Sequence, residues 1–249
     1  KKKLIMWVWV LCACGFAHIL LGVAKLVRSV HAAARRRPVR IISLEGLIGC
    51  GKTTQIRRLA ALNLPRVRVI EEPVAEWEER GLLRAVYGGA LSKAVFQHAV
   101  LMSLATELQS ALQEPDVDLI ISERSPWSNR AVFALTNLTD AIELQAYEYT
   151  FEKVMQGICR WPLRVTLVHL AVGVAAARAR IHTRGRAAEN SVSDEYLLEL
   201  KKAHDDLMQE PARAYPTAAP PGCDLETCVV DASGSADVVF TSLCALLRI

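Results

Sequence analysis

The chain has 249 residues, enough for one α/β domain of medium size, and it carries 30 Lys and Arg against 26 Asp and Glu. Nine of the basic residues and no acid precede Glu45, which leaves 21 basic and 26 acidic residues and a net charge of about −5 over residues 45–249. Because a nucleic-acid-binding domain needs a basic face, this balance argues against that class of protein. The seven cysteines lack the spacing of a zinc site, which favours free thiols in a reducing compartment.

An apolar stretch over residues 4–24 is followed by a basic linker that ends at Pro38. As a helix, the stretch would span about 31 Å, which matches the core of a bilayer. Its more basic C-terminal flank would keep the rest of the chain in the cytoplasm. We therefore expect an N-terminal segment, residues 1–38, that is either a membrane anchor or a cleaved targeting peptide (secretory or mitochondrial), or neither of these, and a folded domain, residues 39–249.

Short apolar runs alternate with helical patterns from residue 39 onward. Helices are expected at 52–63, at 92–114 with Ser92 as the first residue and Pro115 as the stop, at 143–160, across a charged region 173–210, and from 236. Buried strands are expected at 39–46, 67–72, 118–123, 163–170 and 226–233. This alternation predicts an α/β fold with a five-stranded parallel sheet that helices cover on both faces.

A phosphate-binding loop is expected between the first strand and the first helix, in the sequence GLIGCGKTT. It matches G-x-x-x-x-G-K-[ST] in the required strand–loop–helix context. Backbone N–H groups at a helix N-terminus favour anions, the lysine would reach the β- and γ-phosphates, and the first threonine would hold Mg²⁺. The predicted ATP-binding residues are Gly46, Leu47, Ile48, Gly49, Cys50, Gly51, Lys52, Thr53 and Thr54. The base-reading motif of a GTPase is not found in the sequence.

Four further motifs follow in order: E-P-V-x-x-W at 72–77, Phe96-Gln97, E-R-S at 123–125, and RIHTRGRAAE at 180–189. In this series the chain resembles the deoxynucleoside kinase family, which includes deoxycytidine, deoxyguanosine, and mitochondrial or viral thymidine kinases. The resemblance covers residues 39–249. It implies a P-loop kinase fold with an arginine-rich lid, a homodimer, and ATP- and Mg²⁺-dependent phosphorylation of the 5′-hydroxyl of a deoxynucleoside.

Two adjacent carboxylates, Glu71 and Glu72, end the second strand. Because side chains alternate across a strand, only one of them can face the ligand crevice at the carboxyl edge of the sheet. The resemblance makes Glu72 the general base, although a simple ion pair with an arginine is the alternative. It also implies that Arg124 contacts the 5′-oxygen and the phosphates, and that Glu123 holds Mg²⁺ with Thr53.

The resemblance also assigns residues to a lid and to a nucleoside pocket. Arg184 and Arg186 would act on the transferring phosphate as catalytic residues, together with Lys52 and Arg124, and Arg180 would bind ATP. A solvated basic helix is the alternative for this region, and simple core packing is the alternative for the pocket aromatics. The predicted substrate-binding residues are Glu72, Trp77, Tyr87, Gln97, Arg124, Asn129, Phe133 and Glu189.

The base preference depends on two positions deep in the pocket. The deoxycytidine kinase pattern pairs an arginine with an aspartate, whereas this chain has Leu104 and Asn129. A neutral pocket resembles that of the members that accept thymidine or several pyrimidines, so we expect thymidine and deoxycytidine to be better substrates than purines. The alternatives are a thymidylate-type monophosphate kinase and a non-catalytic ATP-binding module.

Overall fold

The computed structural model describes residues 38–186, 189 and 191–249. The predicted anchor or targeting segment, residues 4–24, lies outside the described residues. Within the described part of the chain, no helix is long and apolar enough to cross a membrane.

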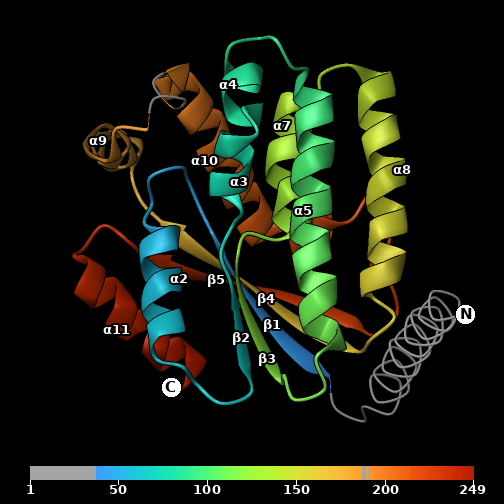
Figure 1. The fold of residues 1–249 in the computed structure, drawn as a ribbon, viewed down its shortest axis with the longest axis vertical. Coiled ribbons are helices and arrows are strands. Elements are labelled where there is room, and N and C mark those ends of the chain that lie inside the picture. The colour runs from blue at the N-terminus through green and yellow to red at the C-terminus, as the bar shows by residue number, and fades with distance from the viewer. Residues whose placement is uncertain (1–37, 187–188, 190) are drawn as a thin grey trace, which may run out of the picture.

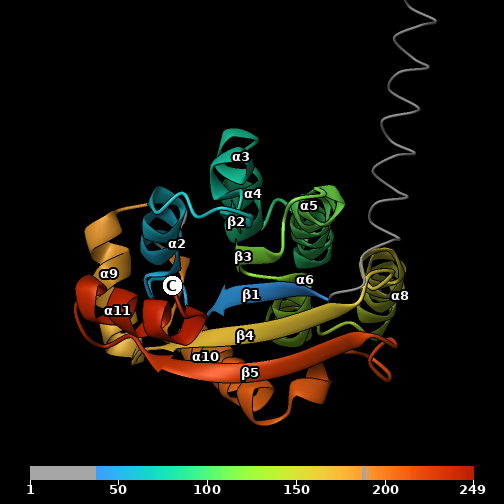
Figure 2. The same cartoon turned by 90° about the horizontal axis from the view of Figure 1, so that it is seen from below.

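All five predicted strands are present and form one parallel sheet, which confirms the predicted fold class. The strands are β1 (Val39–Glu45), β2 (Val67–Ile70), β3 (Leu119–Glu123), β4 (Leu163–Ala171) and β5 (Cys223–Asp231). Their order is β2-β3-β1-β4-β5, and every neighbouring pair is parallel. The central strands β1 and β3 are almost wholly buried, as their apolar sequences require. Figure 2 shows the strands lying side by side in one twisted sheet.

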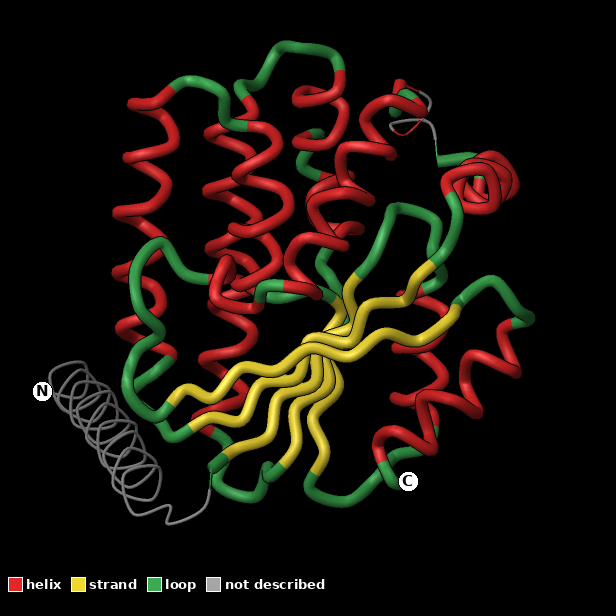
Figure 3. The backbone as a smooth tube through the Cα atoms, turned by 180° about the vertical axis from the view of Figure 1, so that it is seen from behind, coloured by secondary structure: helices red, strands yellow, loops and turns green. Residues whose placement is uncertain are grey.

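Helices pack on both faces of the sheet (Figures 1 and 3). Helix α2 (Lys52–Ala61) packs on β1, β2 and β3, and α11 (Ala236–Leu247) packs on α2 and β5. Helix α5 (Lys93–Gln113) packs on β2 and α8 (Ala141–Ile158), and α10 (Asp194–Gln209) packs on β4 and β5. The Ser92 hydroxyl accepts a hydrogen bond from the backbone N–H of Val95, so Ser92 caps α5 as expected.

Several elements begin or end one or two residues from their expected bounds. Strand β2 ends at Ile70, so Glu71 and Glu72 lie just beyond the strand and do not end it as expected. The structure differs from the expected elements in three further places. The charged region 173–210 forms two helices, α9 (Val174–Arg184) and α10, because Gly185 takes a left-handed φ of 66° and ends α9. Strand β5 begins and ends earlier than the expected range 226–233. Short helices that the sequence pattern did not predict fill the long connections; they are α3 (Val74–Glu79), α4 (Leu82–Tyr87), α6 (Pro126–Ser128), the π-helix η1 (Asn129–Ala134), α7 (Leu135–Asn137) and the 3₁₀ helix η3 (Pro211–Ala214).

The strand order fixes where a ligand can bind. From β1 the chain first moves to β2 and β3 on one side, and then crosses to β4 and β5 on the other. Such a reversal opens a crevice beyond the carboxyl ends of the strands, where the connecting loops diverge. The phosphate loop, Glu72 and Arg124 all follow the carboxyl ends of β1, β2 and β3.

Candidate active site

A pocket of about 1020 Å³ lies at this carboxyl edge of the sheet. Its volume is at the upper end of the range for small-molecule sites, so it has room for more than one small ligand. The pocket is lined by the phosphate loop with α2, the segments from Glu72 through the first half of α5, the end of β3, η1, α7, and α9 with its connection to α10. The predicted site residues that line it are Ile48, Gly49, Gly51, Lys52, Thr53, Thr54, Glu72, Trp77, Tyr87, Gln97, Glu123, Arg124, Asn129, Phe133, Arg180, Arg184, Arg186 and Glu189.

Three predicted loop residues do not line the pocket: Gly46, Leu47 and Cys50. The side chains of Leu47 and Cys50 are buried in the core, so only the backbone at these positions is available for a ligand. Gly49 has a φ of 82°, and a Cβ atom built there would lie 2.5 Å from the carbonyl oxygen of Ala177 in α9. Glycine is therefore required where α9 packs against the loop.

Lys52 and Thr53 start α2 at the floor of the pocket. The Lys52 ammonium donates to the carbonyl oxygens of Gly46 and Leu47, at 3.2 and 2.9 Å. The Thr53 hydroxyl donates to Glu123 Oε1 at 2.7 Å, while Glu123 Oε2 is buried without a hydrogen-bond partner among the described residues. Burial raises the pKa of Glu123, and the nearby negative charge of Glu72 raises it further. A buried carboxylate oxygen without a partner beside a threonine hydroxyl fits a Mg²⁺ ligand set.

Glu72 and Arg124 form an ion pair in the middle of the pocket, with 3.1 Å between Arg124 Nε and Glu72 Oε1. Arg124 is buried, its backbone φ is 63°, and its Nη1 donates to the Gly46 carbonyl oxygen at 3.2 Å. Burial acts to lower the pKa of Arg124, but the carboxylates around it, Glu72 first, outweigh that effect and raise it. The guanidinium also lies 4.3 Å from the ring centroid of Phe133.

The adjacent carboxylate points elsewhere, as expected, although both residues lie just beyond the end of β2. Glu71 pairs with Arg57 of α2 through two guanidinium nitrogens, and both side chains are exposed to solvent. Glu72 does pair with an arginine, as the alternative interpretation held, but that arginine itself lines the pocket. Glu72 is therefore the carboxylate of this pair that a bound substrate can reach.

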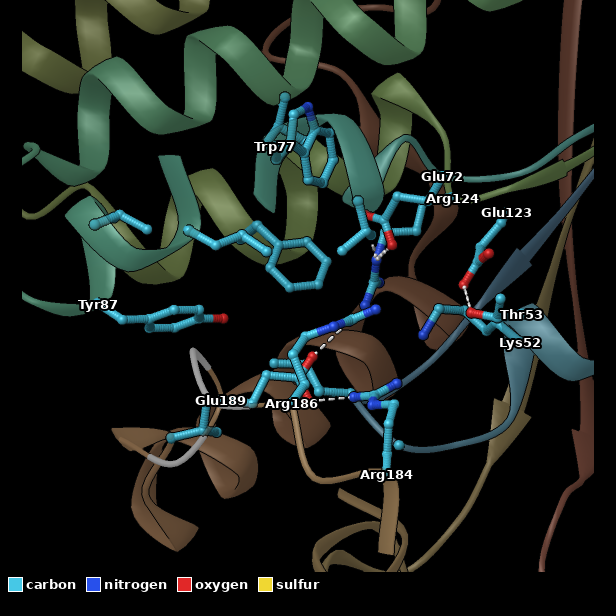
Figure 4. A pocket seen from close by; sticks show the side chains of 18 of the residues that line it. Lys52, Thr53, Glu72, Trp77, Tyr87, Glu123, Arg124, Arg184, Arg186 and Glu189 are labelled. Atoms are coloured by element: carbon cyan, nitrogen blue, oxygen red, sulfur yellow. Dashed lines mark hydrogen bonds and ion pairs between the residues drawn. The ribbon is translucent and has the colours of Figure 1, made fainter. Parts of the chain in front are cut away.

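The other end of the pocket is apolar. Trp77 lies edge-on to Phe96, with 5.8 Å between ring centroids, in a cluster that includes Val100 and Leu104. Leu104, which was expected deep in the pocket, is buried in this cluster and does not line the pocket. The amide of Gln97 lies at the edge of this cluster, bound to Asn129 at 2.8 Å. Figure 4 shows Glu72 and Arg124 between the Lys52, Thr53 and Glu123 group on one side and Trp77 and Tyr87 on the other. The pocket therefore has a charged half and an aromatic half.

The lid arginines are bonded to protein groups rather than directed into solvent. Arg184 and Arg186 both bind the carboxylate of Glu189, and Arg186 also pairs with Glu78 at 2.9 Å. Arg180 donates to the backbone oxygens of Cys50 and Ala232, at 3.1 and 3.0 Å. The alternative of a solvated basic helix does not fit these contacts. The catalytic roles of the three arginines, and closure of a lid, remain predictions.

Several residues around the pocket were not predicted from the sequence. The hydroxyl of Tyr196 in α10 accepts a hydrogen bond from Asn137 at 2.9 Å, and both residues line the pocket. Glu45 is buried at the end of β1, where its Oε1 accepts from the hydroxyls of Ser43 and Ser125. Ser125 also caps α6. A glutamate directly before a phosphate loop was the available signal for Glu45, whereas nothing in the sequence pattern points to Tyr196.

Comparison with known proteins agrees with this geometry. A family model described as deoxynucleoside kinase matches residues 42–241. The thymidine kinase of Ictalurid herpesvirus 1 (strain Auburn) is 31% identical over 174 residues, covering 66% of this chain and 72% of that protein. The putative kinase protein 029R of Invertebrate iridescent virus 3 is 31% identical over 169 residues, covering 67% and 81%.

The same fold is found in a solved structure, deoxyadenosine kinase from M. mycoides with bound dATP. The TM-score is 0.58 at 21% identity, and the likeness covers 84% of this chain and 100% of that one. The family match includes the phosphate loop, Glu72, and the E-R-S motif that ends β3. The chain therefore belongs to the deoxynucleoside kinase family and is a phosphotransferase.

Proposed function

We propose that this protein transfers the γ-phosphoryl group of ATP to the 5′-hydroxyl of a pyrimidine deoxynucleoside. The proposal depends on one observation above all: the Glu72–Arg124 ion pair lies between a phosphate loop and an aromatic pocket. A nucleoside whose base lies against Trp77 and Phe96 would bring its 5′-carbon toward Glu72. Its 5′-oxygen would then approach the phosphates cradled by the backbone of residues 46–54.

In the proposed reaction, Glu72 accepts the proton of the 5′-hydroxyl as that oxygen attacks the γ-phosphorus. The new O–P bond forms in line with the breaking bond to the β,γ-bridging oxygen, and ADP leaves. Lys52 and Arg124 lie close enough to the phosphate loop to offset charge on the phosphoryl oxygens. Arg184 and Arg186 could add to this by exchanging their bonds with Glu189 for bonds to phosphate.

A magnesium ion fits beside Thr53 and Glu123, where Glu123 Oε2 is buried without a partner among the described residues. These two side chains would hold the ion or its water ligands, and the ion would neutralise charge on the β- and γ-phosphates.

The base end of the pocket supports a pyrimidine preference. Leu104 is 4% exposed and packs with Trp77 and Phe96 behind the lining of the pocket, so this position supplies no arginine to the base end. Asn129 pairs with Gln97, so a neutral amide pair occupies the deep end. An amide can both donate to and accept from a base edge, so it can pair with cytosine in one of its orientations and with thymine in the other. The herpesvirus relative is named a thymidine kinase.

The test is to supply ATP and Mg²⁺ with each of the four deoxynucleosides, or with thymidine monophosphate, and to identify the products. We expect thymidine and deoxycytidine to give 5′-monophosphates with the highest kcat/KM. A clear preference for deoxyguanosine would contradict the pyrimidine assignment. Phosphorylation of thymidine monophosphate but not of thymidine would replace the proposal with a monophosphate kinase.

A further inference from the structure

A chain of three buried polar side chains runs from helix α8 to the base end of the pocket. The Tyr147 hydroxyl donates to Asn129 Oδ1 at 2.5 Å, and Asn129 Nδ2 donates to Gln97 Oε1 at 2.8 Å. The three residues come from α8, η1 and α5, and their exposures are 0%, 1% and 5%. Gln97 and Asn129 line the pocket, whereas Tyr147 lies behind them.

The hydroxyl at the start of this chain sets the direction of both amides. Burial raises the pKa of Tyr147 well above its ordinary range, so the hydroxyl keeps its proton at any working pH. Among the described residues, Asn129 is the hydrogen-bond partner of that hydroxyl. Asn129 must therefore present its oxygen to Tyr147 and its NH₂ group to Gln97, which in turn directs its oxygen toward Asn129.

Reversing the two amides would break this arrangement. Asn129 would then present its NH₂ group to the tyrosine oxygen, and the tyrosine proton would lose its acceptor in a fully buried site. A buried donor without an acceptor is strongly unfavourable. Gln97 thus meets the base with a fixed arrangement of its Nε2 donor and its Oε1 acceptor.

A fixed amide discriminates between the two pyrimidines. Cytosine presents an acceptor at N3 and a donor at its 4-amino group, whereas thymine presents a donor at N3 and an acceptor at O4. In one pose the two bases therefore require opposite orientations of the same glutamine amide. An amide that can turn over would accept both bases, and an amide that cannot would favour one.

We propose that Tyr147 is a specificity-determining residue: acting through Asn129, it fixes the orientation of the Gln97 amide and so makes the enzyme discriminate between thymidine and deoxycytidine. This inference rests on the proposed function, because it requires that Gln97 meets the base of a pyrimidine nucleoside. It goes further in stating that one of the two pyrimidines is disfavoured, and in naming a residue outside the pocket as the cause.

The test is the ratio of kcat/KM for thymidine and deoxycytidine in the full chain. We expect wild type to favour one nucleoside by about tenfold or more, which is ~1.4 kcal/mol at 25 °C. Tyr147→Phe removes the proton that fixes Asn129, so kcat/KM for the disfavoured nucleoside should rise while that for the favoured one changes little. Tyr149→Phe is the matched control, because Tyr149 lies on the same helix and is 63% exposed; it should leave the ratio unchanged.

A merely structural role for Tyr147 would lower kcat/KM for both nucleosides together and leave their ratio intact. Asn129→Ala, which interrupts the same chain of hydrogen bonds, should shift the ratio, and adding Tyr147→Phe to it should shift the ratio no further. Additive shifts, a wild-type ratio near one, or an unchanged ratio in Tyr147→Phe would overturn the proposal.

Calorimetric binding of the two nucleosides separates this inference from the proposed reaction. If wild type phosphorylates neither nucleoside but binds one about tenfold more tightly, and Tyr147→Phe removes that difference, the reaction is wrong and the role of Tyr147 stands. If it binds neither nucleoside, both are wrong.

Discussion

Replacing Glu72 with glutamine removes the proposed general base while keeping the size and shape of the side chain. The adjacent Glu71→Gln is a matched control, because it makes the same chemical change one residue away, at a side chain that points out of the pocket. Glu71 binds Arg57 at the surface, whereas Glu72 binds the buried Arg124 inside the pocket. A comparison of the two variants therefore separates the effect of losing the carboxylate inside the pocket from the effect of losing any carboxylate in this segment.

From the structure we expect different effects on kcat for the two variants. In Glu72→Gln the amide oxygen can still accept from Arg124 Nε, and the buried guanidinium keeps Glu45 and Glu123 as neighbouring negative charges. Nucleoside binding should therefore change by less than about threefold, while kcat falls by about 10²–10⁴, the usual contribution of a general base. Glu71→Gln loses only an exposed ion pair, worth about 0–1 kcal/mol of stability, and should keep its kcat.

The assay is single-turnover formation of the nucleoside 5′-monophosphate at saturating ATP, with calorimetric binding of the nucleoside in parallel. Single-turnover conditions exclude product release as the measured step. A Glu72→Gln variant that retains near-normal turnover would refute the role of Glu72 as base. A large fall in kcat for Glu71→Gln would refute the assignment of the two carboxylates to opposite sides.

Three further outcomes are expected. Gly49→Ala places a methyl group 2.5 Å from the Ala177 carbonyl oxygen, so it should lower the free energy of unfolding by about 1–3 kcal/mol and weaken ATP binding. Gly173→Ala, with open space around its Cβ, should do neither. Thermal melts with and without ATP measure both effects. Glu123→Gln should raise the Mg²⁺ concentration needed for half-maximal activity by about 10–100-fold, and Mg²⁺ titration of both activity and ATP-dependent melting temperature checks this. Burial raises the pKa of Glu45 above its ordinary 4.5, so the folded state holds more protons than the unfolded state. The free energy of unfolding should therefore fall as pH rises from 4.5 through the folded pKa. Glu45→Gln should flatten this pH dependence, which denaturant titrations at several pH values measure.

The sequence was sufficient where the structure follows from local spacing. The period-two alternation predicts that Glu71 and Glu72 point to opposite sides. The two side chains do take different partners, although β2 ends at Ile70, one residue before them. The partner of Glu71 could not be predicted, because Arg57 lies 14 residues earlier and meets it only when α2 packs on β2. Local spacing thus predicts only that the two carboxylates diverge. The family resemblance assigns Glu72 to the pocket, and the partner of Glu71 depends on tertiary packing.

The region predicted to form a lid shows what helical spacing cannot predict. Arg180 and Arg184 are four residues apart in α9, and this spacing predicts that they share one helix face. Both line the pocket, yet Arg180 reaches back to the Cys50 carbonyl oxygen while Arg184 binds Glu189 beyond the end of the helix. Long flexible side chains choose partners from the surrounding fold, so a shared face does not fix a shared ligand.

The hydrogen-bond chain behind Gln97 could not be predicted for a similar reason. Tyr147 lies 18 residues after Asn129 in the sequence, and Asn129 lies 32 residues after Gln97. The three meet because α5 and α8 pack side by side with η1 against both. A tyrosine within an amphipathic helix has the same pattern as any core aromatic residue, so only the packed structure distinguishes it.

Arg124 explains why the two halves of the pocket should act together. Its left-handed φ of 63° is unfavourable for a side chain of this kind and persists only when the surroundings hold it in place. The Gly46 carbonyl oxygen, the Glu72 carboxylate and the Phe133 ring supply that restraint from the phosphate loop, the proposed base and the pocket wall. A phosphate that drew Arg124 away from Gly46 would therefore also disturb its contact with Glu72. Binding at the phosphate loop would then change the environment of the Glu72 carboxylate through the Arg124 guanidinium.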